Sequence, residues 1–256
     1  MSKPLILITN DDGIYAPGIR TLIRVMQEIG DILVVAPDKP QSGMGHAITT
    51  TIPLRIKKVF HNGEYNEYAT NGTPVDCIKF SDYLLNRIRP DLIVSGINHG
   101  SNASINIIYS GTMAAVLEGA INNIPAIGFS VTDFSHHIDL SFTEKYVRKI
   151  ALNVLEHGLP PNTALNVNIP YFQDQPVKGI RVCRQARAYW KETFEEKKDP
   201  HNRAYYWLTG DFCLTDDKDD TDQWALDNNY VAVVPVQVDF TSYNTISLIN
   251  KWDFHV

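Results

Sequence analysis

Residues 5–37 read LILITNDDGIYAPGIRTLIRVMQEIGDILVVAP and carry the pattern of a strand, a helix and a second strand. The apolar run Leu5–Thr9 is typical of a buried strand, and the run at 32–36 is typical of another. Between the two runs, apolar residues recur at helical spacing until Gly30, which we expect to lie at the end of the helix. A unit of this kind predicts two parallel strands joined by a helix on one face of a sheet.

The same alternation continues to about residue 170. We expect further strands at 92–95, Ala126–Val131 and 165–169, and helices at 74–87, 113–121 and 144–156. Thr73-Pro74 indicates a helix N-cap, and Ser141 with Glu144 has the spacing of a capping box. Residues 47–58 and 65–70 alternate between apolar and polar positions around Asn62-Gly63, which predicts a β-hairpin. Together these elements predict an α/β fold with a mostly parallel sheet and helices on both faces.

Beyond Pro170 the pattern changes. Residues 180–187 and 230–238 are typical of strands, and between them lie several large aromatic residues and an acidic run at 216–222. We therefore divide the chain into an α/β catalytic core at 1–170 and a β-rich extension at 171–256. Because large aromatic residues at a surface favour interfaces, we expect the extension to act as an arm for oligomer assembly.

Composition and charge exclude several classes of protein. The chain has 256 residues, of which 44% are hydrophobic and 20% charged, as is typical of a soluble globular protein. Its net charge of -6 argues against duplex nucleic acid as the main partner. The three cysteines are far apart and form no Cys-x-x-Cys pair, which argues against a disulfide framework and a structural zinc site. No run approaches the roughly 18 apolar residues of a membrane span, and we expect a cytoplasmic protein.

Polar residues follow the predicted strands, where open α/β sheets bind their ligands. Asn10-Asp11-Asp12-Gly13 follows the first strand. Two adjacent carboxylates are costly to hold together unless a cation neutralises them, so Asp11 and Asp12 indicate a metal site. The same residue types are preferred in simple turns, and on its own this loop fits either interpretation.

Two further loops offer oxygen ligands. Ser42 lies in the loop 37–46, whose glycines allow close approach of the backbone, and Asn98 lies in the polar loop after a later strand. Hydroxyl and amide oxygens suit a hard cation, and the Asn98 amide could instead contact a phosphate. Taken singly, the loop at 37–46 also fits a flexible surface loop, and the loop that contains Asn98 also fits a polar turn. The lone His46 and His99 are weak signals for a ligand or an acid–base group.

Tyr109-Ser110-Gly111-Thr112 immediately precedes the helix expected at 113. Backbone N–H groups at a helix start form an anion site, and the hydroxyls of Ser110 and Thr112 would add donors. These residues also fit a simple N-cap. Neither GxxxxGK[ST] nor GxGxxG occurs, so the expected anion is a phosphate monoester and not a triphosphate or a dinucleotide. Oxygen-only metal ligands beside a helix-terminus anion site predict a metal-assisted phosphoester hydrolase.

Five segments occur in the order seen in one known family, namely ITNDDGIYAPGI, APDKPQSGMGHAIT, NGTPVDC, VSGINHGSN and YSGTMAAVLEGA. On these motifs the chain resembles the SurE family of survival-protein nucleotidases, closely over about residues 5–131 and loosely over the rest. The resemblance implies a Rossmann-like α/β core and a domain-exchanged C-terminal region that builds homodimers or homotetramers. It also implies a phosphoric monoester hydrolase for nucleoside monophosphates, a 5′-nucleotidase that could also accept 3′-nucleotides. One divalent cation per subunit, Mg²⁺ or Mn²⁺, is the cofactor that the resemblance implies.

Carried over position by position, the resemblance places metal ligands at Asp11, Asp12, Ser42 and Asn98, and phosphate-binding residues at Asn98, Ser110, Gly111 and Thr112. Asp11 and Asp12 are also the expected catalytic pair, because one of them would take the proton of the attacking water in a hydrolysis without a covalent intermediate. The chain departs from the family at Ser104-Ile105-Asn106, where many members have a Gly-Asp pair. This departure leaves the expected metal ligands intact and concerns the conformation of the loop.

Three other classes fit part of the pattern. A non-catalytic nucleotide-binding module on the same fold would need the phosphate site but not two adjacent aspartates, and turnover with added metal separates it from a hydrolase. A phosphoacceptor receiver domain needs an acceptor aspartate at the end of a later strand, whereas Asp91 precedes its strand. A phosphatase with an aspartyl nucleophile needs Asp-x-Asp after the first strand, whereas this chain has Asp-Asp-Gly.

Overall fold

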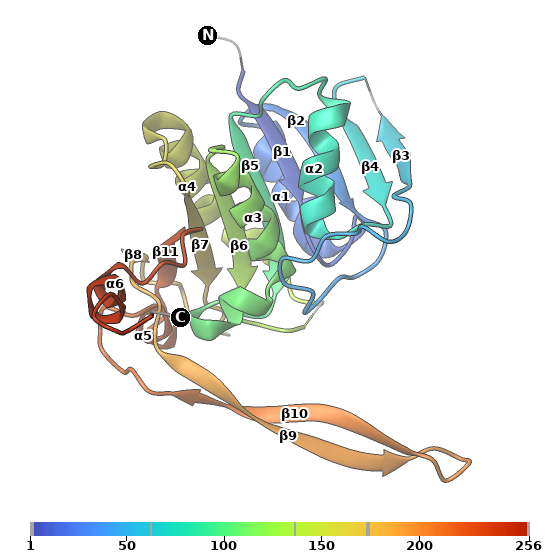
Figure 1. Cartoon of the computed structure of the whole chain (residues 1–256). Helices are drawn as coiled ribbons and strands as arrows, with labels where there is room; N and C mark the ends of the chain where they lie inside the picture. Colours follow the sequence, from blue (N-terminus) through green and yellow to red (C-terminus); the bar gives the residue numbers. More distant parts are fainter. Residues whose placement is uncertain (1–2, 62, 136, 173–174, 255–256) are drawn as a thin grey trace.

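The protein is described by a computed structural model that covers residues 3–61, 63–135, 137–172 and 175–254. Within these residues, nine strands form one sheet in the order β3-β4-β2-β1-β5-β6-β7-β11-β8 (Figure 1). The strands of this sheet are β1 Leu5–Thr9, β2 Asp31–Pro37, β3 Ile56–His61, β4 Asn66–Thr70, β5 Leu92–His99, β6 Ala126–Val131, β7 Thr163–Ile169, β8 Ile180–Val182 and β11 Val231–Gln237. Pairing is parallel except between β3 and β4 and between β7 and β11, so the predicted mostly parallel α/β sheet is confirmed.

Helices cover both faces of the sheet. They are α1 Pro17–Gln27, α2 Pro74–Leu84, α3 Gly111–Ile121, α4 Glu144–His157, α5 Asp222–Asp227 and α6 Tyr243–Ile249, with short 3-10 helices η1 Ser104–Tyr109 and η2 Leu140–Thr143. Helices α1 and α4 pack on one face, and α2 and α3 pack on the other. Ile6 and Ile8 of β1 point into the core under α1, whereas Leu7 points into the core under α2 and α3. A strand buried on both faces in this way is apolar throughout, which explains its sequence.

The alternating segment before β3 does not form the expected strand. Strand β3 begins only at Ile56, and residues 47–55 pair with no neighbouring strand. Ile48 and Ile52 are more than half exposed, so their alternation does not mark a buried face. The segment is held instead by α2, because the Thr73 hydroxyl donates a hydrogen bond to the Ala47 carbonyl at 2.7 Å. Strands β3 and β4 form the predicted antiparallel pair, while Asn62 of the predicted turn lies outside the described residues.

Two helix ends differ from the expectation. The predicted capping box of α4 is wrong, because Ser141 lies in η2 and its hydroxyl bonds to Asp139, while the N-cap Thr143 makes no side-chain cap bond. Gly158 ends α4 as predicted, with a positive φ of 71° that favours glycine. Helix α2 starts at Thr73-Pro74 with a complete capping box, as expected, but ends at Leu84.

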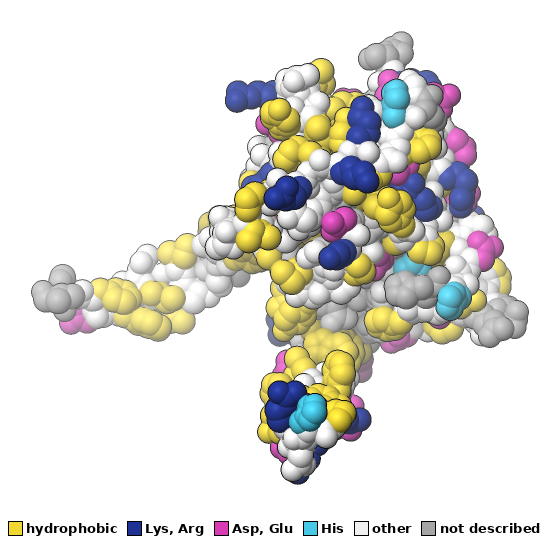
Figure 2. Space-filling model, turned by 90° about the vertical axis from the view of Figure 1, so that its right-hand side faces the viewer, with side chains coloured by type: hydrophobic (Ala, Val, Ile, Leu, Met, Phe, Trp, Pro, Cys, Tyr) yellow, Lys and Arg dark blue, Asp and Glu magenta, His cyan; other side chains and the backbone are white. Residues whose placement is uncertain are grey.

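A long hairpin leaves the body of the molecule (Figure 1). It consists of β9 Ala188–Lys198 and β10 Ala204–Leu214, which pair antiparallel over their full length. Figure 2 shows its tip projecting from the body, with hydrophobic side chains next to charged ones. Strands β8 and β11 lie in the main sheet although they come from beyond residue 170, and the division of the chain at that residue stays a prediction. No helix in the described ranges is long and apolar enough to cross a membrane.

Candidate active site

The carboxyl ends of β2, β1 and β5 lie side by side, because these three strands are neighbours and run parallel. Asp11 and Asp12 follow β1, the loop with Ser42 follows β2, and Asn98 lies near the end of β5. The sheet therefore brings three of the polar loops identified in the sequence to one edge. The start of α3, with Ser110 at its N-cap, joins them through direct contacts with Asp11.

Asp11 is buried against the start of α3. The Thr112 hydroxyl donates a hydrogen bond to Asp11 Oδ1, although the two residues are 101 positions apart. A Cβ added at Gly111 would lie 2.8 Å from Asp11 Cβ and 3.1 Å from Oδ2, so only glycine fits this contact. Burial raises the pKa of Asp11 to about 6, the Thr112 hydroxyl opposes the rise, and the charge of Asp12 adds to it.

Asp12 has one carboxylate oxygen that the described residues leave unsatisfied. Its Oδ2 is buried and makes no hydrogen bond there, and it lies 3.5 Å from Nδ1 of His99. Asn10 Oδ1 nearby in the chain is likewise buried without a hydrogen bond. Buried polar atoms are normally paired, so such oxygens beside a second carboxylate are suited to bind a cation. Among the residues described, no group of three or more His, Cys, Asp or Glu side chains could hold a metal, so a cation here needs hydroxyl, amide or water oxygens as well.

Ser42 lies in the loop after β2, directly after Gln41. The Gln41 N–H donates to the Asp11 carbonyl at 2.8 Å, which holds the start of this loop over the aspartate pair. The Gly45 N–H donates to the Tyr109 carbonyl at 3.3 Å and so ties the loop to the segment before α3. Ser42 itself is exposed and lies between these two ties in the chain. Its role as a metal ligand stays a prediction.

The loop is also tied to α3 by a pair of side chains. His46 Nε2 lies 3.1 Å from Glu118 Oε2, and Lys79 Nζ donates to Glu118 Oε1 at 2.6 Å. Glu118 is buried, and the His46 hydrogen bond is the main cause that lowers its pKa to about 2, with Lys79 acting in the same direction against the effect of burial. His46 therefore has a partner in the body of the protein, which the sequence could not show because the two residues are 72 positions apart.

Asn98 and Ser110 already serve the local structure. The Asn98 amide nitrogen donates to the Gly100 carbonyl at 2.8 Å, which orients the amide and directs its oxygen away from that bond. Ser110 Oγ accepts from the Met113 N–H at 3.0 Å and so forms the N-cap of α3. Because the Thr112 hydroxyl is bonded to Asp11, an anion at this helix start would meet the backbone N–H groups of Gly111 and Thr112 and not the Thr112 hydroxyl.

His99 lies against Asp12, a contact that the sequence did not indicate. Its side chain is 1% exposed, and the residue directly follows Asn98 at the end of β5. The one sequence signal for a role of His99 is its position after a predicted strand. His46 also follows a predicted strand, so this signal does not distinguish the two histidines. The contact with Asp12 appears only when β1 and β5 pair.

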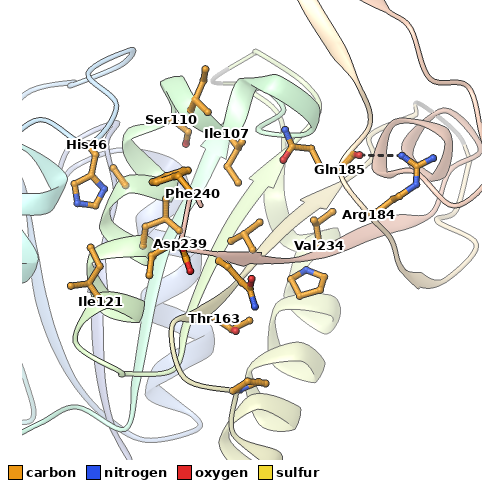
Figure 3. A pocket seen from close by; sticks show the side chains of 18 of the residues that line it. His46, Ile107, Ser110, Ile121, Thr163, Arg184, Gln185, Val234, Asp239 and Phe240 are labelled. Atoms are coloured by element: carbon orange, nitrogen blue, oxygen red, sulfur yellow. Dashed lines mark hydrogen bonds between the residues drawn. The ribbon is translucent and has the colours of Figure 1, made fainter. Parts of the chain in front are cut away.

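A large cavity lies beside this site and includes neither Asp11 nor Asp12 in its lining. It has a volume of about 890 Å³ and runs between α3 and β11, with His46 and Ser110 at one end and Arg184 and Gln185 at the other (Figure 3). Its wall is mainly aliphatic, with Ile107, Ile121 and Val234 among the lining residues. Asp239 and Phe240, between β11 and α6, also line this cavity.

Known proteins resemble the chain over its whole length. A family model described as "Survival protein SurE" matches residues 6–192. The chain is 54% identical over 256 residues to a protein of Flavobacterium psychrophilum named "5'-nucleotidase SurE", with 100% of both chains covered. A protein of the same name from Bacteroides fragilis is 44% identical, with 98% of each chain covered. The crystal structure of the SurE protein from Aquifex aeolicus has a TM-score of 0.83 at 37% identity, covering 96% of this chain and 98% of that one.

Proposed function

The chain belongs to the SurE family of survival proteins, and from this membership we propose that it is a divalent-metal-dependent phosphatase that hydrolyses nucleoside monophosphates to nucleoside and phosphate. It is thus a phosphoric monoester hydrolase, a 5′-nucleotidase. Activity on 3′-nucleotides is a second expectation, which the family resemblance alone implies. One observation carries the proposal: the start of α3 packs directly on Asp11, which brings a carboxylate pair and an anion-binding helix end into contact.

Asp11 and Asp12 would hold the cation, one Mg²⁺ or Mn²⁺ per subunit, together with the Ser42 hydroxyl and the Asn98 amide oxygen. All four are oxygen ligands of the kind that these hard cations prefer. A bound divalent cation polarises a phosphate oxygen and lowers the pKa of a bound water. The buried Asp12 Oδ2 supports this assignment, because it makes no hydrogen bond within the described residues and is of the oxygen type that such a cation binds.

The remaining residues bind the phosphate and move the proton. The backbone N–H groups of Gly111 and Thr112 and the hydroxyl of Ser110 would bind the phosphate oxygens, with the Asn98 amide on the other side. One carboxylate of the aspartate pair would accept the proton of the attacking water, and no covalent enzyme intermediate forms. His99 Nδ1 lies 3.5 Å from Asp12 Oδ2 and would hold that carboxyl group in position.

We propose further that the protein is cytoplasmic and works as a homodimer or homotetramer. The hairpin exposes large aromatic side chains, among them Phe194, Tyr206 and Trp207. No residue of α6 is buried in the described structure, although this helix carries Ile246 and Leu248. The adjoining apolar cavity would suit an exchanged C-terminal segment of a second subunit, as the family resemblance implies.

The experiment that tests the activity is a panel of phosphate esters, assayed with EDTA and with added Mg²⁺ or Mn²⁺. Nucleoside 5′- and 3′-monophosphates, a sugar phosphate and a phosphodiester form the panel. We expect turnover of the nucleoside monophosphates that EDTA abolishes and added metal restores. Nucleotide binding without phosphate release under any metal would instead support the alternative, a non-catalytic nucleotide-binding module on the same fold.

A further inference from the structure

Asp222 is a buried carboxylate that joins two distant parts of the chain. It is the first residue of α5 and is fully shielded from solvent. Its Oδ2 accepts a hydrogen bond from the Ser104 N–H at 2.7 Å, and its Oδ1 accepts one from the Ala186 N–H at 2.9 Å. The Ser104 hydroxyl in turn donates to the Ala186 carbonyl at 3.0 Å. Three hydrogen bonds thus close a small ring around this carboxylate.

The two partners of Asp222 belong to the site and to the hairpin. Ser104 opens η1, which runs directly into Ser110 at the N-cap of α3. Ala186 lies two residues before β9, at the root of the hairpin. A second bond makes the same connection, because the Trp190 indole N–H donates to the Asn106 side-chain oxygen at 2.8 Å. Figure 1 shows the hairpin leaving the body beside the segment that precedes α3.

The unusual segment Ser104-Ile105-Asn106 supplies both connections. Ser104 has a φ of 56°, in the left-handed region that glycine adopts freely and that costs other residues about 1 kcal/mol. This conformation persists because Asp222 and Ala186 hold both the N–H and the hydroxyl of Ser104. A serine here therefore gains a bond to the hairpin root that a glycine could not make.

We propose that Asp222 is a positioning residue that clamps the loop between Asn98 and Ser110 onto the root of the hairpin and so sets the phosphate-binding start of α3. Burying a carboxylate is costly, and here backbone N–H donors compensate it. Asparagine cannot replace it, because one end of its amide is a donor and would face an N–H group. The inference rests on the proposed function for its kinetic readout. The clamp itself can be measured without turnover, by phosphate binding and by hydrogen exchange.

The test compares Asp222→Asn with Asp220→Asn, a matched loss of charge two residues away at an exposed position that bonds to Arg184. For Asp222→Asn we expect the KM for a nucleoside monophosphate and the Kd for inorganic phosphate to rise about tenfold, as for the loss of one hydrogen bond to a charged group. The calorimetric Kd for Mn²⁺ should rise less than the Kd for phosphate, because the proposed ligands Asp12 and Ser42 lie on loops that the clamp does not hold. Asp220→Asn should leave all three constants unchanged.

A lower melting temperature with wild-type KM and phosphate Kd would overturn the proposal and make Asp222 a purely structural residue. If wild type shows no turnover, the proposed function fails. The clamp is then still tested by whether the phosphate Kd rises in Asp222→Asn and stays unchanged in Asp220→Asn. If Asp222→Asn does not fold, two other measurements decide. The Ser104 and Ala186 amides of wild type must be protected from hydrogen exchange, and Trp190→Phe must raise the phosphate Kd. Rapid exchange at both amides, or an unchanged Kd in Trp190→Phe, would refute the clamp.

Discussion

Among single residues, Asp12 contributes a buried carboxylate oxygen that makes no hydrogen bond within the described residues. Asp12→Asn should remove most of the charge that attracts a cation and lower phosphatase activity by about two orders of magnitude or more. The fold should persist, because the substitution keeps the size of the side chain and relieves repulsion with Asp11. Asp38→Asn, an exposed carboxylate after β2, is the control and should keep its activity. Activity of Asp12→Asn close to that of wild type at saturating Mn²⁺, with an unchanged circular dichroism spectrum, would contradict the assignment.

Gly111 is the residue whose lack of a side chain brings α3 onto Asp11. In Gly111→Ala the new Cβ would lie 2.8 Å from Asp11 Cβ, so either the helix start or the carboxylate must move. We expect calorimetric titrations to show weaker binding of both inorganic phosphate and Mn²⁺, because the two proposed binding groups share this contact. Gly119→Ala, farther along α3, is a matched control, since its Cβ would also lie 2.8 Å from a neighbour, Ile93 Cδ1, but away from Asp11, and it should keep both affinities. If Gly111→Ala binds phosphate and Mn²⁺ as tightly as wild type, the start of α3 is not the phosphate site.

Glu118 gives the protein a pH-dependent contribution to stability. Its pKa is lowered to about 2 from an ordinary 4.5, mainly by the hydrogen bond from His46. The stabilisation is therefore complete above about pH 4.5 and is lost as the pH falls toward 2, and its full size is on the order of 3 kcal/mol. Urea unfolding of wild type and Glu118→Gln should show a difference in unfolding free energy at pH 6 that shrinks steadily toward pH 3. A difference that does not depend on pH would mean that ionised Glu118 does not stabilise the fold.

The sequence placed the site residues at strand ends but could not show their contacts. Asp11 with Thr112 and His46 with Glu118 are pairs separated by 101 and 72 residues, and both depend on how α3 packs against the sheet. Motif order indicated which loops to consider as a site. It did not indicate that the Thr112 hydroxyl is bonded to a carboxylate, because that bond exists only once the start of α3 packs on the loop after β1.

Among the helices and strands, local pattern predicted the buried elements well and the exposed ones poorly. Strands β1 and β6 match their expected limits, because a strand buried on both faces needs an unbroken apolar run. The alternation at 47–55 was misleading, since a period of two marks a strand only when a neighbouring strand is there to pair with it. Likewise Ser141 with Glu144 had the spacing of a capping box, but the hydroxyl found a closer partner in Asp139.

Helix α2 illustrates how one cap can support a loop. The Thr73 hydroxyl accepts from the Asp76 N–H in the capping box and donates to the Ala47 carbonyl in the loop after β2. Thr73→Ala should lose both bonds and lower the free energy of unfolding by about 1–2 kcal/mol. Thr73→Ser keeps the hydroxyl and should stay close to wild type. Thermal or urea unfolding of the three proteins measures the effect, and equal stability of Thr73→Ala and wild type would show that neither bond contributes.

In the whole molecule, the candidate site and the hairpin belong to different sheets. The candidate site lies at the edge of the nine-stranded sheet, and β9 and β10 form a separate two-stranded sheet. The hairpin instead exposes aromatic side chains to solvent, which is costly for an isolated chain and typical of a surface that another subunit covers. Asp222 connects the two parts, so that an assembly built through the hairpin would also hold the loop before α3 in place.

Shortening the hairpin tests its role in assembly. Replacing residues 191–211 by an Asn-Gly turn would join Trp190 and Phe212, which face each other across the hairpin with ring centroids 5.5 Å apart. The bond from Trp190 to Asn106 is kept, so the loop before α3 should stay in place and the monomer should fold. Because the exposed aromatics of the hairpin are removed, we expect sedimentation to show a smaller assembly than wild type at micromolar concentration. Equal masses for the two proteins would show that the hairpin is not an assembly contact, and a monomeric wild type would refute the proposed oligomer altogether.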